Sequence, residues 1–154
     1  MSARILVAAL LLGVQPACAS SPRPVSTEDV VLAVVLRDVI ADAPQWATPL
    51  LCGPGRSDPS PALLALVRSH FTVPVAVCSD QMPDPGNPLV AIHRVTGART
   101  YAVHWNSVQP CATREYEVHA GFTCGLNCGT EYVYRVVLRD GLWHVLEKCI
   151  VFVP

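Results

Sequence analysis

The chain has 154 residues, of which 51% are hydrophobic and 15% are charged, and its formal net charge at pH 7 is −1. No basic cluster or basic helix face occurs in the sequence, which argues against nucleic acid and acidic membrane surfaces as partners. A chain of this length can bury one sizeable core, so a single domain is expected.

The N-terminus has the pattern of a secretory signal peptide over residues 1–19. A short basic segment precedes the apolar run 5–14, and Ala17-Cys18-Ala19 supplies the small residues that signal peptidase requires. The sequence therefore predicts export, to the periplasm or out of the cell. Lipidation of Cys18 is an alternative, although Gln15 and Pro16 match poorly the residues that normally precede a lipoprotein cysteine. Membrane attachment is expected only if Cys18 carries a lipid.

A helix is predicted soon after a short flexible lead, residues 20–25, at the start of a single domain that spans 26–154. Ser26 and Asp29 have the spacing of a capping box, in which a hydroxyl precedes a carboxylate by three residues. The run 30–43 that follows is long enough for a helix. Because many of its residues are β-branched, a buried strand is the alternative.

A second helix is predicted over residues 62–70, with Ser60 as its N-cap and Pro61 in its first turn. Residues 46–61 before it are rich in proline and glycine and are expected to be irregular. Alternating apolar residues between turn signals then predict a series of strands. Strands are expected over 73–78, 89–95, 99–106, 114–122, 131–139 and 142–153, with a loop over 82–88.

The last two strands are expected to form a hairpin, because Asp140-Gly141 readily takes the positive φ angles of a type I′ turn. A two-residue turn pairs Leu138 with Trp143, Val136 with Val145, Tyr134 with Glu147 and Tyr132 with Cys149. The face predicted to join the core carries Tyr132, Tyr134, Val136, Leu138, Trp143, Val145 and Val151. The face predicted to be partly wet carries Glu131, Arg135, Arg139, His144 and Lys148.

Cysteine is an informative residue, because an even number of cysteines in an exported chain predicts a disulfide framework. The six that follow the predicted signal peptide are Cys52, Cys78, Cys111, Cys124, Cys128 and Cys149. If the four C-terminal strands form an up-and-down meander, one strand length separates Cys111 from Cys124. Cys111 is therefore expected to pair with Cys52 or Cys78.

The remaining cysteines leave two alternatives open. Cys124 can form a local bridge with Cys128, or Cys149 can pair with either of them. Redox enzymes of the thioredoxin type place two residues between their cysteines at a helix N-terminus, whereas here three residues intervene in a loop between strands. This spacing favours a structural disulfide, and neither a metal nor a cofactor is expected.

The C-terminal third combines Cys124-Gly125-Leu126-Asn127-Cys128-Gly129, a tyrosine-rich strand and Asp140-Gly141-Leu142-Trp143-His144-Val145. This pattern resembles a group of uncharacterised exported bacterial proteins, and the terminal hairpin is similar to that of NTF2-like domains. The resemblance implies an α+β fold, NTF2-like or cystatin-like. One or two N-terminal helices would pack on a curved antiparallel sheet of about four to six strands. It implies an exported location but no reaction.

The preferred functional hypothesis is a non-catalytic binding or interaction module whose partner is a protein or a small apolar ligand. Its sheet would offer a pocket lined by Tyr132, Tyr134 and Trp143, or by Tyr101 and Trp105. Alternation on a half-buried sheet also requires apolar residues at such positions, and a role in the core is the favoured interpretation of the same aromatic side chains.

The alternative hypothesis is a small hydrolase or isomerase of NTF2-like fold. His104, His119 and Glu117 lie on strands that are expected to be neighbours, and they are the candidate acid and base. No spacing in the sequence brings the three side chains together. Their convergence in one cavity would favour the enzyme, whereas a filled interior would favour the interaction module.

Overall fold

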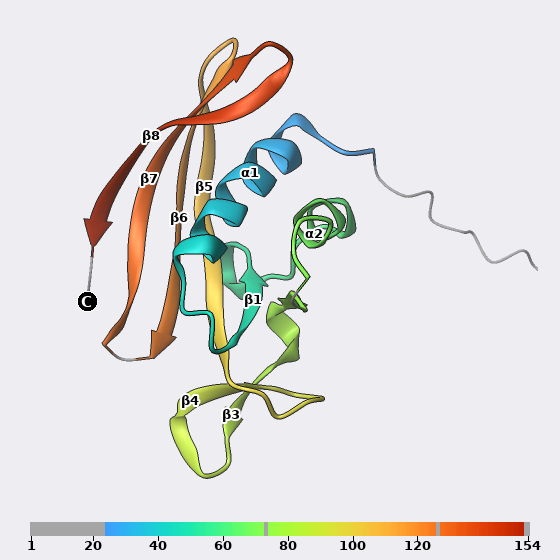
Figure 1. Ribbon diagram of the computed structural model, residues 1–154, viewed down its shortest axis with the longest axis vertical. Helices are drawn as coiled ribbons and strands as arrows, with labels where there is room; N and C mark the ends of the chain where they lie inside the picture. The colour runs from blue at the N-terminus through green and yellow to red at the C-terminus, as the bar shows by residue number, and fades with distance from the viewer. Residues whose placement is uncertain (1–23, 73, 126, 153–154) are drawn as a thin grey trace, which may run out of the picture.

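The computed structural model describes residues 24–72, 74–125 and 127–152. Two helices cover one face of a six-stranded sheet, and a small two-stranded sheet lies at one end of the molecule (Figure 1). The helices are α1 (Thr27–Asp42) and α2 (Pro61–Arg68), and the 3₁₀ turns are η1 (Pro54–Arg56) and η2 (Cys78–Asp80). The strands are β1 (Thr48–Cys52), β2 (Ala76–Val77), β3 (Gln81–Asp84), β4 (Asn87–His93), β5 (Thr100–Ala112), β6 (Glu115–Gly125), β7 (Cys128–Arg139) and β8 (Leu142–Phe152).

The large sheet has the order β2-β1-β5-β6-β7-β8, and the small sheet pairs β3 with β4. Strands β5 to β8 form the predicted antiparallel meander, whereas β1 runs parallel to both β2 and β5. The fold is α+β, as the sequence predicts. The predicted signal peptide lies outside the described residues, and no described helix is long and apolar enough to span a membrane.

The capping box predicted for α1 is confirmed. The Ser26 hydroxyl accepts a hydrogen bond from the backbone N–H of Asp29, and the Asp29 carboxylate accepts one from the backbone N–H of Ser26. The N-cap of α2 is also confirmed, because the Ser60 hydroxyl accepts a hydrogen bond from the backbone N–H of Leu63. Ser60 in turn donates to Asp29 at 3.0 Å. The two helices are thus joined at their first turns.

The core lies between α1 and the face of the sheet that the helices cover, here called the inner face. On the helix side it contains Val31, Val35 and Val39, each 0% exposed. On the sheet side, alternate residues of the meander point inward, as the period of a strand requires. The buried residues of β5, β6 and β7 are Tyr101, Val103, Trp105, Val118, Ala120, Phe122, Tyr132, Tyr134 and Val136.

Two parts of the chain differ from the prediction. Residues 46–61 were expected to be irregular, but β1 lies in the interior of the sheet, where Leu50 and Leu51 are fully buried. A short apolar run that contains Pro49 lacks the alternation that identifies a half-buried strand. Residues 82–88 were expected to form a loop, but they contribute to the β3–β4 hairpin.

The β7–β8 hairpin confirms the predicted turn, because Asp140 and Gly141 have φ angles of 51° and 77°. The pairing is as predicted as far as Val136 with Val145, and then a bulge shifts it by one residue. Beyond the bulge, Tyr134 pairs with Lys148 rather than with Glu147, and Tyr132 pairs with Ile150 rather than with Cys149.

The bulge places Lys148 on the inner face, so its predicted position on the wet face is wrong. Its ammonium group contacts Asp38 at 2.6 Å and also pairs with Asp42, both on α1. The same group lies 4.3 Å from the centre of the Tyr132 ring. Burial alone would lower the pKa of Lys148, but the hydrogen bonds with the two carboxylates raise it above its usual value.

Val151, predicted to be core, is 63% exposed at the edge of the sheet.

Two disulfides are present, one between Cys52 and Cys78 and one between Cys124 and Cys128. The local bridge is one of the two alternatives that the sequence left open. The expected pairing of Cys111 with Cys52 or Cys78 is not formed, because β1 brings Cys52 beside Cys78, with a Cα–Cα distance of 4.8 Å. Cys111 and Cys149 are unpaired and exposed. Two disulfides are consistent with an extracytoplasmic location.

Candidate functional site

The helices leave the opposite face of the sheet, here called the outer face, free to carry polar side chains. The outward residues of β6 include Glu117, His119 and Thr123, which alternate with the buried residues of the same strand. On β5 the outward residues include Thr100 and His104. The outer face is therefore the face on which polar chemistry can be built.

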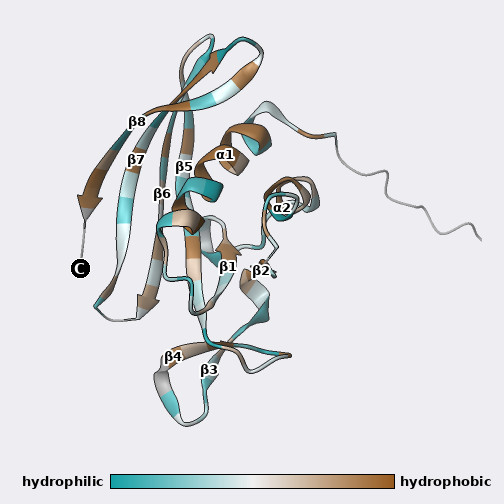
Figure 2. Ribbon diagram, in the orientation of Figure 1, coloured by the Kyte–Doolittle hydropathy of each residue, from teal (hydrophilic) through white to brown (hydrophobic). Residues whose placement is uncertain are grey.

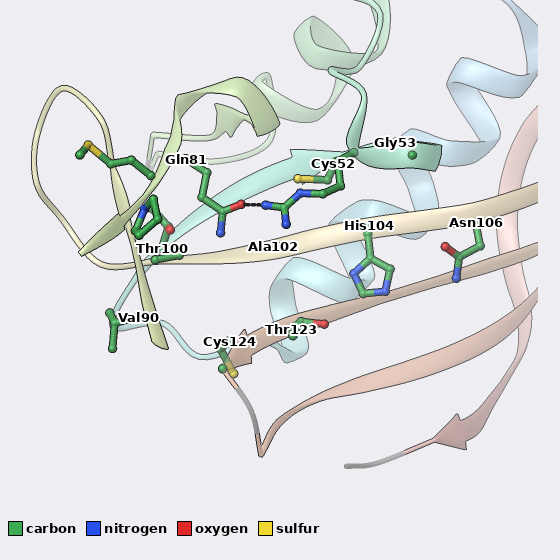
Figure 3. Close-up of a pocket in the computed structure, with 16 residues that line it drawn as sticks. Cys52, Gly53, Gln81, Val90, Thr100, Ala102, His104, Asn106, Thr123 and Cys124 are labelled. Carbon is green, nitrogen blue, oxygen red and sulfur yellow. Dashed lines mark hydrogen bonds between the residues drawn. The ribbon is translucent and has the colours of Figure 1, made fainter. Parts of the chain in front are cut away.

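A cleft of about 700 Å³, here called the outer cleft, lies between the outer face, η1 and the β3–β4 hairpin (Figure 3). Its apolar lining comes from both sheets and includes Met82, Pro83, Val90, Ala91 and Ala102. Its polar lining includes Arg56, Gln81, Thr100, His104, Asn106 and Thr123. One cysteine of each disulfide, Cys52 and Cys124, also borders it. The disulfides thus fix two parts of the wall of the outer cleft.

A histidine–carboxylate pair lies beside the outer cleft. His104 on β5 is paired with Gly121 on β6, and Gly121 is paired with Glu131 on β7, so the three residues form a row across three strands. The Nε2 atom of His104 is hydrogen-bonded to the Glu131 carboxylate. The His104 side chain is 19% exposed and that of Glu131 is 32% exposed. A carboxylate in this position fixes the orientation of the imidazole ring.

Gly121 makes this pair possible. The histidine reaches over the middle strand to its carboxylate partner because the residue between them has no side chain. A Cβ atom at Gly121 would lie 2.2 Å from the carbonyl oxygen of Thr130 and 3.0 Å from the Cα atom of Glu131. Both are backbone atoms of the neighbouring strand, so only glycine fits at this position.

The outer cleft contains a cation on η1 and a buried hydroxyl on β5. The guanidinium group of Arg56 donates a hydrogen bond to the side-chain oxygen of Gln81, drawn as a dashed line in Figure 3. The Thr100 hydroxyl is buried and has no hydrogen-bond partner among the described residues. The Arg56 guanidinium group on one side of the outer cleft and the unpaired Thr100 hydroxyl on the other suit a ligand that offers hydrogen-bond acceptors.

The structure separates the three side chains proposed as acid and base. His104 lines the outer cleft, whereas His119 and Glu117 lie further along β6 and bond to each other at 3.1 Å. Glu117 borders a second groove on the outer face, of about 190 Å³, together with Cys111 and Cys149. The three therefore share a face of the sheet but no cavity.

The five aromatic residues proposed to line a ligand pocket belong to the core. Tyr101, Trp105, Tyr132 and Tyr134 are at most 8% exposed, and the partly buried Trp143 packs against them. Burial raises the pKa of Tyr101 to about 12. Burial, followed by the charge of Asp38 and the hydrogen bond to it, raises the pKa of Tyr134. None of the five side chains borders the outer cleft.

Sequence reasoning did not single out Glu131, Gly121 or Arg56 as site residues. Gly121 carried a signal, because a glycine inside a strand often marks a close approach of two backbones. Glu131 and His104 are 27 positions apart, and only the strand register brings them together. Among residues 24–72, 74–125 and 127–152, no group of three His, Cys, Asp or Glu side chains is arranged to hold a metal ion.

The fold and the outer cleft thus define a small disulfide-linked α+β domain with a site on the uncovered face of its sheet. Comparisons with protein-family models, with curated proteins and with solved structures found no match to this chain. The resemblance of the C-terminal hairpin to NTF2-like domains stays a prediction, and the function has to be argued from the site itself.

Proposed function

We propose that this protein is an exported, non-catalytic binding domain that holds a small amphipathic ligand in the outer cleft. The observation that carries the proposal is the cleft itself, in which apolar side chains of two sheets face a few convergent polar groups. Ligand sites in proteins typically have this composition. The two disulfides support action outside the cytoplasm, in the periplasm or beyond the cell, or at a membrane if Cys18 carries a lipid.

The filled interior of the sheet also supports a binding module whose site is on the outer face. The inner aromatic residues contact one another, as in the edge-to-face contact of Tyr101 with Phe122 at 6.3 Å between ring centres. A ligand on the inner face would have to displace these contacts. The outer cleft requires no such displacement.

The lining indicates the class of ligand. Met82, Val90 and Ala91 offer an apolar wall for a hydrocarbon or aromatic body. Arg56 and Asn106 offer donors to a carboxylate or carbonyl at its polar end. The ligand class that fits is therefore a small apolar body with one acceptor group, for example an aryl carboxylic acid.

A test with matched fragments checks this proposal. Saturation-transfer NMR would screen a set of aryl carboxylic acids, and the arenes that carry a methyl group in place of each carboxyl group, against the protein. Thr123→Trp, an exposed substitution in the outer cleft, should abolish binding of the acids. Gln109→Trp, an exposed substitution on β5 outside the cleft, is the matched control and should leave binding unchanged. Binding that survives Thr123→Trp, or acids that bind no better than the methyl arenes, would contradict the proposal.

The His104–Glu131 pair favours one second candidate, acid–base catalysis by His104 as in a small hydrolase or isomerase. Among the described residues the lining of the outer cleft contains no serine, and its cysteines belong to disulfides, so a covalent mechanism has few nucleophiles available. A panel of chromogenic esters separates the two functions. Turnover that His104→Gln abolishes without loss of thermal stability would establish the enzyme, whereas no turnover supports the binding module.

A further inference from the structure

Strand β8 forms one edge of the large sheet, and among the described strands it is hydrogen-bonded only to β7. In Figure 1 it runs along the side of the molecule away from α2, with no other described helix or strand beyond it. An edge strand of this kind presents unpaired N–H and C=O groups that can accept another strand. Its C-terminal end is hydrophobic (Figure 2).

Exposed aliphatic side chains are concentrated on this edge. Of the seven large hydrophobic residues that are exposed in the described part of the chain, four lie on β8. They are Leu142, Leu146, Ile150 and Val151, and Ile150 and Val151 are 65% and 63% exposed. Scattered exposed aliphatic residues are ordinary, but a cluster on an open edge indicates an interaction surface.

The same edge carries an unpaired cysteine. Cys149 is exposed and lies on β8 between Glu147 and the two aliphatic residues at the end of the strand. The Cys149 thiol donates a hydrogen bond to the carboxylate of Glu147 at 3.6 Å. The hydrogen bond to Glu147 raises the pKa of the Cys149 thiol, so this cysteine is not activated as a nucleophile. In an oxidising compartment a thiol of this kind is expected to end in a structural disulfide.

A second copy of the chain supplies the matching thiol. If two β8 strands pair antiparallel about a two-fold axis at Cys149, each Cys149 lies opposite its own copy. Directly opposite residues of antiparallel strands have Cα atoms about 4.5–5.5 Å apart. This distance lies within the range of about 4.4–6.8 Å that a disulfide requires.

Charge also favours a pairing centred on Cys149. Lys148 then lies opposite Ile150 of the second copy, and Glu147 lies opposite Val151. A two-fold axis at Lys148 would instead place lysine opposite lysine, and an axis at Glu147 would place glutamate opposite glutamate. Like charges in directly opposite positions are destabilising. Pairing about Cys149 therefore brings Ile150 and Val151 against the second copy without opposing like charges.

Bulges restrict how far the pairing can extend. The register of β8 shifts at Leu146 and again at Val151, so only residues 147–150 run regularly between them. Bulges on an edge strand oppose long strand pairing and thereby limit aggregation. A contact this short needs a covalent bond to hold it, and its two-fold symmetry closes it at two chains.

We propose that two copies of this protein form a dimer through antiparallel pairing of their β8 strands, closed by a disulfide between the two Cys149 residues. A low-molecular-weight disulfide such as oxidised glutathione is the oxidant. Two thiols lose two protons and two electrons to form the S–S bond, and the oxidant takes them up as two molecules of reduced glutathione. The dimer does not depend on the outer cleft and is independent of the proposed ligand.

The test uses the exported protein equilibrated in a buffer of reduced and oxidised glutathione. Light scattering after size exclusion should give twice the mass of one chain, and non-reducing digestion should yield a peptide linked through Cys149 to Cys149. Cys149→Ser should give a monomer. Cys111→Ser is the matched control, because it removes the second unpaired and exposed cysteine of the described residues and should leave the dimer intact.

Hydrogen exchange separates strand pairing from a chance crosslink. Backbone amides of residues 147–150 should exchange more slowly in the dimer than in the Cys149→Ser monomer. A crosslink through Cys111, a Cys149 that stays a thiol or carries glutathione, or a Cys149-linked dimer without slower exchange would each overturn the proposal.

Discussion

The two disulfides are expected to contribute unequally to stability, and paired cysteine-to-alanine substitutions measure the difference. The Cys52–Cys78 bridge joins residues 26 positions apart, whereas the Cys124–Cys128 bridge joins residues 4 positions apart. A disulfide stabilises the fold mainly by restricting the unfolded chain, and the effect grows with the length of the closed loop. Removal of the Cys52–Cys78 bridge should therefore lower the stability of the fold more than removal of the Cys124–Cys128 bridge.

Chain-entropy arithmetic gives the size of the effect. At 25 °C the longer loop contributes about 3.5 kcal/mol and the shorter loop about 1.9 kcal/mol. For a domain of this size, each kcal/mol corresponds to roughly 4 °C in Tm. Removal of the Cys52–Cys78 bridge should lower Tm by about 14 °C, and removal of the Cys124–Cys128 bridge by about 8 °C. Cys52 and Cys78 are also buried with Leu50 and Ala76, so lost packing adds to the first value.

Differential scanning calorimetry of the oxidised protein checks this order. The variants are Cys52→Ala with Cys78→Ala, and Cys124→Ala with Cys128→Ala. Cys111→Ala, at an exposed unpaired cysteine, is the control and should leave Tm almost unchanged. Equal losses in the two double variants, or a larger loss from the Cys124–Cys128 pair, would refute the reasoning from loop length.

Two further predictions concern one position on each face of the sheet. Gly121→Ala should lower the free energy of unfolding, measured by urea denaturation, by about 1–3 kcal/mol, because the new Cβ atom would meet the carbonyl oxygen of Thr130. Gly86→Ala is the control and should lower it less, because its Cβ atom would have no contact closer than 3.5 Å. Tyr101→Phe should reduce the loss of stability between pH 10 and pH 12 in alkaline denaturation. Burial raises the pKa of Tyr101 to about 12, so between these pH values the unfolded chain releases a proton that the folded chain retains, and stability falls as pH rises. An unchanged alkaline slope in the phenylalanine variant would show that Tyr101 does not titrate in this way.

Local signals predicted those parts of the fold that local interactions determine. The helix α1 was predictable because Ser26 and Asp29 satisfy each other's backbone groups within one turn. The β7–β8 turn was predictable because Asp140 and Gly141 favour positive φ. The register beyond the bulge was not predictable, because it depends on Lys148 reaching the carboxylates of a helix far away in the sequence.

The candidate site was only half predictable for the same reason. A histidine on a strand is visible in the sequence, and His104 was singled out. Its partner is not visible, because the pair of His104 and Glu131 exists only when the registers of β5, β6 and β7 place Gly121 between them. The sequence paired His104 with His119 and Glu117 instead, which the structure places further along the face.

The inner face is closed where β8 meets α1, and this closure determines where ligands and partners can bind. Tyr134 donates a hydrogen bond to Asp38 at 2.9 Å, Tyr132 donates one to Asp42 at 3.2 Å, and Lys148 bonds to both carboxylates. The polar ends of the two tyrosines are thereby satisfied against the helix, and the lysine covers their rings. A ligand entering from this edge would have to break a charged network that is already complete. The outer cleft and the open edge of β8 require no such rupture, so recognition by this domain is expected in the outer cleft and along that edge.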